Sequence, residues 1–199
     1  MPDWTHIPPA ELFALLASIA FAAGLNLYAT VAVLGLLARF GQLPLPPGLE
    51  VLSGWTVIGV SMTLFAIEFV ADKIPFVDLA WNALHTFIRV PVAGLLAYEA
   101  TKQLSPGEQL LATALGTAVA LAAHGGKTAA RAAVTHSPEP FSNIALSLAE
   151  DAAAVGLTWL ATRYPYVAGA IALSCVAVIA VMIRWVVRAV RALFRGTKG

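Results

Sequence analysis

The stretch 124–151, HGGKTAARAAVTHSPEPFSNIALSLAED, decides the fold of this chain. An apolar segment, 110–123, leads into it, and another, 144–160, leads out of it. Ionisable side chains are nevertheless dense within the stretch: His124, Lys127, Arg131, His136, Glu139, Glu150 and Asp151. An ionisable group at membrane depth costs from about 3 to more than about 10 kcal/mol, so it is rarely present by accident. The stretch therefore indicates a membrane protein with polar groups at membrane depth.

The overall composition agrees with this interpretation. Of the 199 residues, 59% are hydrophobic and 12% are charged, against about 45–50% and about 25% in soluble domains. The formal net charge of +1 and the lack of a basic run with interleaved aromatics argue against nucleic-acid binding. The single cysteine, Cys175, allows no internal disulfide, and the N-terminus lacks the basic region of a cleaved signal peptide. We expect one all-α domain over 1–199: a polytopic transmembrane helical bundle with interrupted or re-entrant helices and two pseudo-repeated halves.

Two polar interruptions mark the first half, about 8–104. The apolar run 12–37 is long enough to span a bilayer once, but Gly24-Leu-Asn26 interrupts it. Glycine weakens a helix and an asparagine at membrane depth needs a partner, so a break or a re-entrant hairpin competes with one long helix. The second interruption comes at the end of the next span.

That span, 53–70, ends in charged residues. Glu68 and Asp72 lie four residues apart and share a helix face, and Lys73 follows them. One interpretation is an ion or proton site with its own counter-charge. The other places Asp72 and Lys73 at the membrane interface, where they mark the end of the helix.

A polar helical stripe comes next. Asp78, Asn82, His85 and Arg89 follow one another at spacings of four, three and four, opposite an apolar stripe. The pattern favours an amphipathic helix lying in the membrane interface over one lining an internal cavity. In the cavity, His85 would suit a proton relay, because histidine titrates near neutral pH. The apolar piece 90–100 is short and interrupted by Pro91 and Gly94, and together with 98–104 it barely spans a bilayer.

A second break is expected in the second half, about 108–195, at His124-Gly-Gly126. After it, Lys127 and Arg131 lie four residues apart and share one helix face. Two interpretations stay open for these cations: they bind an anionic substrate, or they pair with acidic residues of the following helix.

Those acidic residues belong to a helix expected over 143–163. Asn143 and Asp151 lie on its polar stripe, with Glu150 beside them. Adjacent residues point about 100° apart on a helix, so Glu150 and Asp151 do not easily form a paired-carboxylate catalytic dyad. We expect one of the two to face a cavity while the other caps a helix or forms an ion pair.

The last helix is apolar over 167–183 and then enters a cationic end, 184–199. Four arginines form a stripe at helical spacing: Arg184, Arg188, Arg191 and Arg195. Because basic residues are concentrated on the cytoplasmic side of membrane proteins, the C-terminus is predicted to be cytoplasmic. The side on which the N-terminus lies stays open, since it depends on whether the first element crosses or turns back.

The two halves of the chain resemble each other in sequence and in the order of their expected elements. Residues 20–29 (AFAAGLNLYA) match 120–129 (ALAAHGGKTA) at an offset of one hundred, and each copy precedes a proline-containing link and a spanning helix. Interrupted hydrophobic segments at corresponding positions of two halves are typical of transporters with a binding site near the bilayer midplane. We therefore expect two halves related by a pseudo-two-fold axis, with equivalent breaks.

Several motifs together resemble a bacterial membrane family known as domain of unknown function 4126. They are 24–30 (GLNLYAT), 68–78 (EFVADKIPFVD), 85–89 (HTFIR), 137–143 (SPEPFSN) and the pair Glu150-Asp151. The resemblance covers nearly the whole chain and implies a multi-pass protein of the bacterial cytoplasmic membrane. It implies no activity, so it carries no residue role to this sequence.

The favoured function is a small transporter or channel with a charged pathway between the halves. The residues expected along it are Asn26, Glu68, Asp72, Lys73, Asp78, His85, Arg89, His124, Lys127, Arg131, Asn143, Glu150 and Asp151. The alternatives are a scaffold or accessory subunit whose charges pair internally, and an enzyme that grips an anionic lipid head group with Lys127 and Arg131.

An enzyme is the less favoured class. The sequence holds no nucleophile elbow, zinc-binding HExxH pair, phosphate loop or dinucleotide fingerprint, and its histidines lack metal-ligand spacing. No catalytic residue, metal or cofactor is therefore expected. The expected partners are membrane lipids, a small ion or anionic solute, and further copies of the chain.

Overall fold

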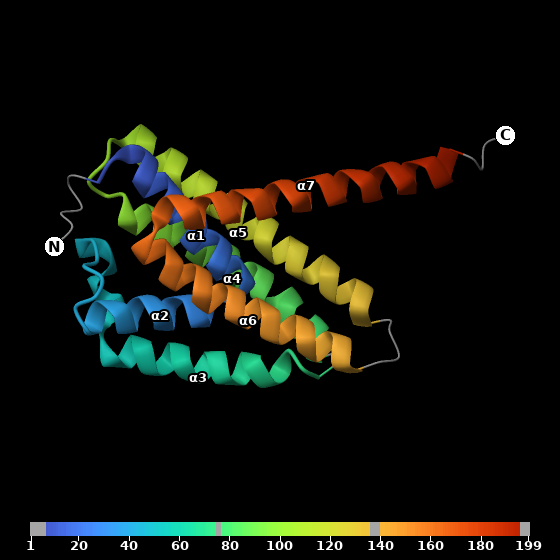
Figure 1. Ribbon diagram of the computed structural model, residues 1–199, viewed down its shortest axis with the longest axis horizontal. Coiled ribbons are helices and arrows are strands. Elements are labelled where there is room, and N and C mark those ends of the chain that lie inside the picture. Colours follow the sequence, from blue (N-terminus) through green and yellow to red (C-terminus); the bar gives the residue numbers. More distant parts are fainter. Residues whose placement is uncertain (1–6, 75–76, 136–139, 196–199) are drawn as a thin grey trace.

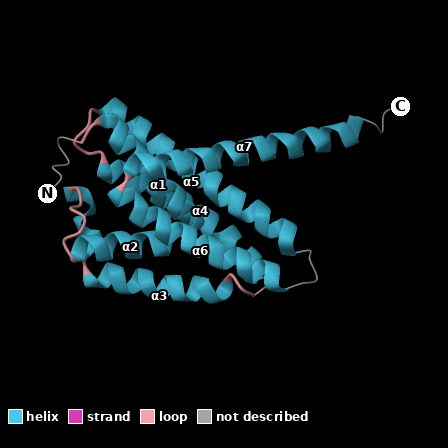
Figure 2. Ribbon diagram, viewed as in Figure 1, coloured by secondary structure: helices cyan, strands magenta, loops and turns pink. Residues whose placement is uncertain are grey.

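The computed structural model describes residues 7–74, 77–135 and 140–195, and this part of the chain is helical, without a strand (Figure 2). Its elements are α1 (Pro9–Leu25), α2 (Leu27–Arg39), the 3-10 helix η1 (Pro47–Ser53), α3 (Trp55–Ala71), α4 (Val77–Ala100), α5 (Pro106–Thr135), α6 (Pro140–Arg163) and α7 (Pro165–Arg195). The expectation of an all-α fold is confirmed. Two stretches, Phe141–Arg163 and Pro165–Arg188, are long and apolar enough to cross a membrane, or three if η1 and α3 count as one bent span.

The distribution of side chains is the reverse of that in a soluble protein. Large apolar side chains such as Val60, Phe87, Leu110 and Trp159 are exposed on the outside of the helices. Most of the charged side chains of the helix interiors are instead buried among them. Soluble proteins almost never bury unpaired charges or expose contiguous apolar surfaces of this extent. The arrangement indicates a membrane protein.

Asn26 separates α1 from α2. Its backbone is extended, with φ −147° and ψ 101°, and its side-chain Oδ1 accepts a hydrogen bond from the amide of Ala29 at 2.9 Å. An asparagine that accepts from the third residue of a helix is a strong helix start. The capping residue therefore specifies the break, and the alternative of one long helix is wrong.

The two helices fold back on each other as a hairpin, with Asn26 at its tip and its two outer ends at the same end of the bundle (Figure 1). The link after α2 lies beside the end of α6, where Arg163 donates to the side chain of Gln42 at 3.3 Å. The tip lies deep inside, next to the middle of α4 and of α6, since Leu25 contacts Arg89 and Asn26 contacts Asp151. α1 packs against α4, α5, α6 and α7 and is the centre of the bundle.

The break predicted at His124–Gly126 is wrong. α5 is one helix from Pro106 to Thr135 and passes through both glycines without interruption. A Cβ on Gly126 would lie 2.7 Å from the side chain of Ile179 on α7. The glycine allows two helices to approach closely, which small residues do in membrane proteins, instead of ending the helix.

The interruption expected at Pro91 and Gly94 is also wrong. α4 runs unbroken from Val77 to Ala100 with Pro91 inside it. Proline costs the helix one backbone hydrogen bond. Inside a membrane bundle, neighbouring helices can satisfy the backbone group that proline leaves without a partner, so proline need not end the helix. The other predicted helices, 53–70, 143–163 and the last, correspond to α3, α6 and α7.

The glycines of α1 and α5 offer a paired test of this packing. A Cβ on Gly24 would lie 2.5 Å from the backbone oxygen of Ala120 and 2.7 Å from the Cβ of Ala123, whereas a Cβ on Gly125 meets nothing within 4 Å. We expect Gly24→Ala to destabilise the protein by about 1–3 kcal/mol, as overpacking does. Gly125→Ala should stabilise it by up to about 1 kcal/mol, because alanine is the better helix former.

The measurement is the thermal midpoint in detergent for both variants beside the unmodified protein. A loss of stability in Gly125→Ala would contradict a continuous α5, because a break with special backbone angles would not accept alanine.

α7 extends past the rest of the bundle toward the C-terminus (Figure 1). Its 31 residues make about 46 Å at about 1.5 Å per residue, longer than the hydrocarbon core of about 30 Å. The side chains over 180–188 are exposed, among them Arg184 and Arg188, and so is Arg191; of Arg195, only the backbone is described. The predicted cationic end of the last helix is thus a continuation of the same helix.

Candidate functional site

Eight charged side chains from α3 to α6 meet in the interior and form what we call the buried charged cluster. They are Glu68, Asp72, Asp78, Arg89, Lys127, Arg131, Glu150 and Asp151, none more than 7% exposed. They come from both halves of the chain, so the expectation that the charged residues of the two halves converge is confirmed.

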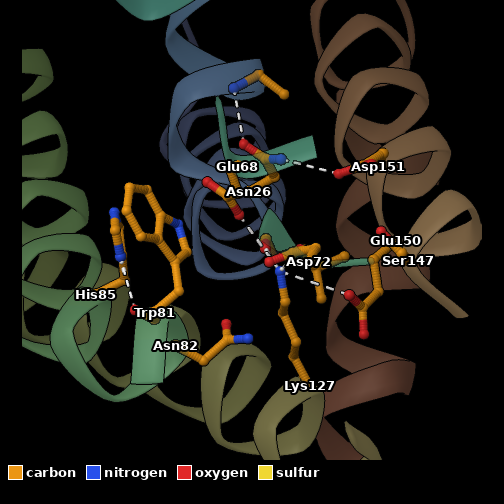
Figure 3. Close-up of polar contacts among 12 residues, drawn as sticks. Asn26, Glu68, Asp72, Trp81, Asn82, His85, Lys127, Ser147, Glu150 and Asp151 are labelled. Atoms are coloured by element: carbon orange, nitrogen blue, oxygen red, sulfur yellow. Dashed lines mark hydrogen bonds and ion pairs between the residues drawn. The ribbon is translucent and has the colours of Figure 1, made fainter. Parts of the chain in front are cut away.

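Lys127 lies at the centre of the cluster (Figure 3). Its Nζ is 2.9 Å from Oδ2 of Asp72, 3.4 Å from Oε1 of Glu68 and 3.5 Å from Oε2 of Glu150. It also donates to the carbonyl oxygen of Leu25 at 3.1 Å. That carbonyl belongs to the last residue of α1, whose helix partner is missing because the helix ends there. The break at Asn26 therefore supplies one of the oxygen atoms that hold the lysine.

Arg131 joins three helices. Its Nη2 pairs with Oδ2 of Asp72 at 3.1 Å and with Glu150, and its Nη1 pairs with Oδ1 of Asp78 at 3.0 Å. Nη1 also donates to the backbone oxygen of Asp72 at 2.7 Å and to Asn143 at 3.5 Å. Five donors in a fixed fork suit an arginine to such a junction. It holds the end of α3, the start of α4 and the first turns of α6 together.

Arg89 lies on the other side of the lysine. Its Nη2 forms an ion pair with Glu68, and its Nη1 donates to the carbonyl oxygen of Leu25 at 3.2 Å and to Asn82 at 3.3 Å. Two cations, Arg89 and Lys127, thus converge on the carbonyl end of α1. Cations are stabilised at a helix C-terminus, where the carbonyl oxygens carry partial negative charge.

Asp151 differs from the other carboxylates of the cluster. Its Oδ1 accepts from the side-chain amide of Asn26 at 2.9 Å, and it forms no ion pair with a described residue. The orientation of Asn26 is fixed by its other end, because Oδ1 of that side chain already accepts from Ala29. The amide nitrogen must therefore face Asp151. Glu150, the neighbouring residue, pairs with Arg131, as expected for one of these two adjacent carboxylates. That the other faces a cavity stays a prediction.

Two histidines border the cluster. Nδ1 of His85 lies 2.7 Å from the backbone oxygen of Trp81, which only accepts, so this nitrogen carries a proton, and its Nε2 lies 2.9 Å from the hydroxyl oxygen of Tyr28. Nδ1 of His124 lies 3.4 Å from Nη1 of Arg89, and its Nε2 lies 2.7 Å from Oγ1 of Thr86. Each ring is thus held at both of its nitrogens.

The buried charges do not cancel. Within the described part of the chain, five carboxylates of the cluster face three cations, an excess of two negative charges. Lys73 lies half-buried at the edge, donates to the backbone oxygen of Phe69 at 2.7 Å, and reduces the excess to one. Three carboxylate oxygens lack a hydrogen-bond partner among the described residues: Oε2 of Glu68, Oδ1 of Asp72 and Oδ2 of Asp151. An unpartnered, buried carboxylate oxygen is costly, so the site has capacity for one more positive charge.

Comparison with known proteins identifies the family. The model of a family described as Domain of unknown function (DUF4126) matches residues 13–185. The chain belongs to this family. No curated protein and no solved structure matches the chain. The match of the DUF4126 model takes in every residue of the buried charged cluster, but its description names no activity, so it assigns no role to them.

The cluster corrects one interpretation of the polar stripe in this DUF4126 protein. Asp78, Asn82, His85 and Arg89 are all buried, between 0% and 2% exposed. The expectation of a helix lying in the membrane interface is therefore wrong, because the stripe faces the interior of the bundle. The amphipathic pattern gives the same signal for a water-facing stripe and for one that faces a polar core.

The other predicted residues lie in the same cluster or next to it. Asp72 is fully buried, and Asn143 donates to its backbone oxygen at 3.2 Å. Lys73 lies at the edge of the cluster. Sequence reasoning missed Tyr28 and Thr86, which bind the two histidines; the position of Tyr28, two residues after the break, was the one available signal. His6, His136 and Glu139 lie outside the described residues.

The described residues contain no group of three or more histidine, cysteine, aspartate or glutamate side chains that could hold a metal ion. The cluster is instead a network in which carboxylates and cations alternate. Such a network can bind or release a proton or a small monovalent ion by rearranging its pairs.

Asn26→Ala tests the junction between the break and the cluster. Alanine removes the cap of α2, worth about 0.5–2 kcal/mol, and leaves Oδ1 of Asp151 without its donor, worth about 1–3 kcal/mol. We expect a fall of about 2–4 kcal/mol in the free energy of unfolding, since the two losses add. Urea or thermal unfolding in detergent measures it, with Asn143→Ala as a second amide variant on the Arg131 side. Unchanged stability in Asn26→Ala would contradict the assigned cap.

Proposed function

We propose that this protein is a small membrane transporter or channel in which an ion moves through the buried charged cluster. The observation that carries the proposal is the meeting of an interrupted helix with an incompletely balanced set of charges in the middle of the bundle. Broken helices with exposed backbone groups at membrane depth are a recurring form of ion and substrate site in transporters.

The hairpin α1–α2 is a re-entrant element in this proposal. Both helices are too short to cross alone, 17 and 13 residues, where a crossing takes about 20. Non-helical backbone inside a membrane is tolerated where it is buried in protein or lines a polar cavity. The tip at Leu25 and Asn26 meets this requirement, because its polar groups bind Arg89, Lys127 and Asp151.

The energetic argument also favours a role beyond holding the fold. A buried ion-pair network is often no more stabilising than well-packed apolar residues of the same volume, because removing the charges from water is costly. A chain that keeps eight buried charges in an apolar bundle therefore keeps them for a property that apolar side chains cannot supply. Ion binding is such a property.

A non-transporting scaffold is the second candidate, and one observation favours it. Four of the five carboxylates of the cluster are ion-paired: Glu68, Asp72, Asp78 and Glu150. The third candidate, an enzyme that grips a lipid head group with Lys127 and Arg131, is weaker, because carboxylates already occupy both cations.

The polytopic topology, the bacterial cytoplasmic membrane and the cytoplasmic C-terminus belong to the same proposal. They rest on the apolar spans and on the arginines at the end of α7, which favour the cytoplasmic side. The relation of the two halves by a pseudo-two-fold axis stays a prediction, tested by superposing them. It does not include equivalent breaks, because α5 has none.

A flux assay tests the proposal. The purified full chain is reconstituted into liposomes, and the uptake of protons, of sodium and potassium, and of small anions is followed in turn. Flux of one of these above that of protein-free liposomes supports transport. No flux of any of them, with the protein correctly folded in the liposomes, removes the transport function and leaves the scaffold.

A further inference from the structure

We propose that the ion handled by the cluster is a proton and that Asp151 is the residue that carries it at neutral pH. This inference rests on the proposed function for its physiological meaning, but the protonation of Asp151 is a property of the folded protein and is measured without transport.

The first argument is the charge balance of the cluster. Glu68, Asp72, Asp78 and Glu150 are each ion-paired with Arg89, Lys127 or Arg131. Those three cations and Lys73 at the edge of the site match these four carboxylates in number. Among the described residues, Asp151 is the surplus carboxylate. A proton on it makes the described part of the site neutral, which is the inexpensive state for a site inside an apolar bundle.

The second argument is the local geometry of Asp151. The residue is 5% exposed, and the hydrogen-bond partner of its Oδ1 is a neutral amide, not a cation. Since the amide of Asn26 is locked by Ala29, Oδ1 of Asp151 is an acceptor and the proton belongs on Oδ2, the oxygen without a partner among the described residues. The aspartic acid thus accepts with one oxygen and carries its proton on the other.

The charged groups around Asp151 act in both directions. Lys127 on α5 and Lys73 after α3 favour its ionised form, as does the N-terminal end of α2 at Asn26, while Asp72 and the neighbouring Glu150 oppose it. Neither of the two lysines forms an ion pair with Asp151: Lys127 pairs with other carboxylates, and Lys73 donates to Phe69 and Ser147. Burial without a paired cation decides in favour of the neutral form.

A proton fits this site better than a metal ion. A hard cation needs several oxygen ligands at once, but the exposed carbonyl of Leu25 is already held by two cationic side chains. A proton needs only one oxygen. Its release would leave an unpaired carboxylate at the hairpin tip, which favours a rearrangement that lets water or Lys127 reach Asp151. Binding and release of the proton at Asp151 would in this way be coupled to the position of the α1–α2 tip.

Infrared spectroscopy of the purified full chain tests the assignment. At neutral pH the folded protein should show the carbonyl stretch of one protonated, solvent-shielded carboxyl group, which disappears in Asp151→Asn. Asparagine reproduces the shape and the neutral charge of the protonated side chain, so the variant should fold. The matched control is Glu50→Gln, an exposed carboxylate in η1, which should leave the band unchanged. A band that persists in folded Asp151→Asn overturns the assignment.

A linkage measurement gives a second, independent readout. If Asp151 is protonated in the folded protein and ionised in the unfolded chain, unfolding near neutral pH releases about one proton, and stability falls as the pH rises. The Asp151→Asn variant should lose this pH dependence, whereas Glu50→Gln should keep it. Equal pH dependence in the unmodified protein and in Asp151→Asn overturns the proposal. A confirmed proton on Asp151 together with no flux in liposomes would remove the transport function but leave the proton site intact.

Discussion

Replacement of Arg131 by methionine is expected to lower the free energy of unfolding by about 3–5 kcal/mol, the cost of breaking a buried ion pair by removing one partner. Arg131 holds Asp72, Asp78 and Glu150, so its loss leaves three buried carboxylates short of a cation. Methionine fills much of the same volume, so the effect reports the charge and not a cavity. The end of α3, the start of α4 and the beginning of α6 should separate first, because they meet at this side chain.

The measurement is the thermal midpoint of the purified protein in detergent. The matched control is Arg163→Met, where an exposed arginine donates to Gln42 at the bundle end and its loss should cost little. An Arg131→Met variant as stable as the unmodified protein would contradict the view that the arginine holds the cluster together. Low pH should partly rescue the variant, since protonation removes the unpaired negative charges.

Glu68→Gln has the largest expected effect on function. Glu68 lies between Arg89 and Lys127, the two cations that also bind the carbonyl oxygen of Leu25 at the end of α1. Glutamine keeps the shape and one acceptor oxygen but removes the charge, and Lys127 retains Asp72 and Glu150. If the cluster is an ion pathway, flux in liposomes should fall to the level of protein-free liposomes in protein that remains folded.

The scaffold predicts a change of stability alone for the same variant. Glu68→Gln leaves Arg89 without its carboxylate under either function and should cost up to about 3–5 kcal/mol. A transporter loses its flux in addition, measured in reconstituted protein that remains folded, whereas a scaffold has no flux to lose; flux therefore separates the two functions. Glu99→Gln is the control, because Glu99 pairs only with Lys102 near the surface at 2.6 Å.

Much of this protein follows from the sequence alone. The apolar runs are long and the charged residues few, so hydropathy by itself predicts helices in a membrane-type protein. Asn26 was recognisable as a candidate break, because an asparagine in an apolar run needs a partner, but one long helix stayed open until its capping hydrogen bond was seen. The charged residues of the cluster were also visible, since ionisable groups in apolar segments have few structural uses.

The tertiary structure decided what these residues contact. His124-Gly-Gly126 and Gly24-Leu-Asn26 look alike in sequence, yet only the second ends a helix, because Gly126 is required by the approach of Ile179 and Asn26 by its own hydrogen bonds. The stripe on α4 has the same spacing whether it faces water or a polar core. The pairing of Asp151 with a neutral amide, and not with a cation, depends on where the tip of α1–α2 meets α6. Periodicity specifies which face of a helix is polar, but only the packing of the helices determines which charge lies opposite which.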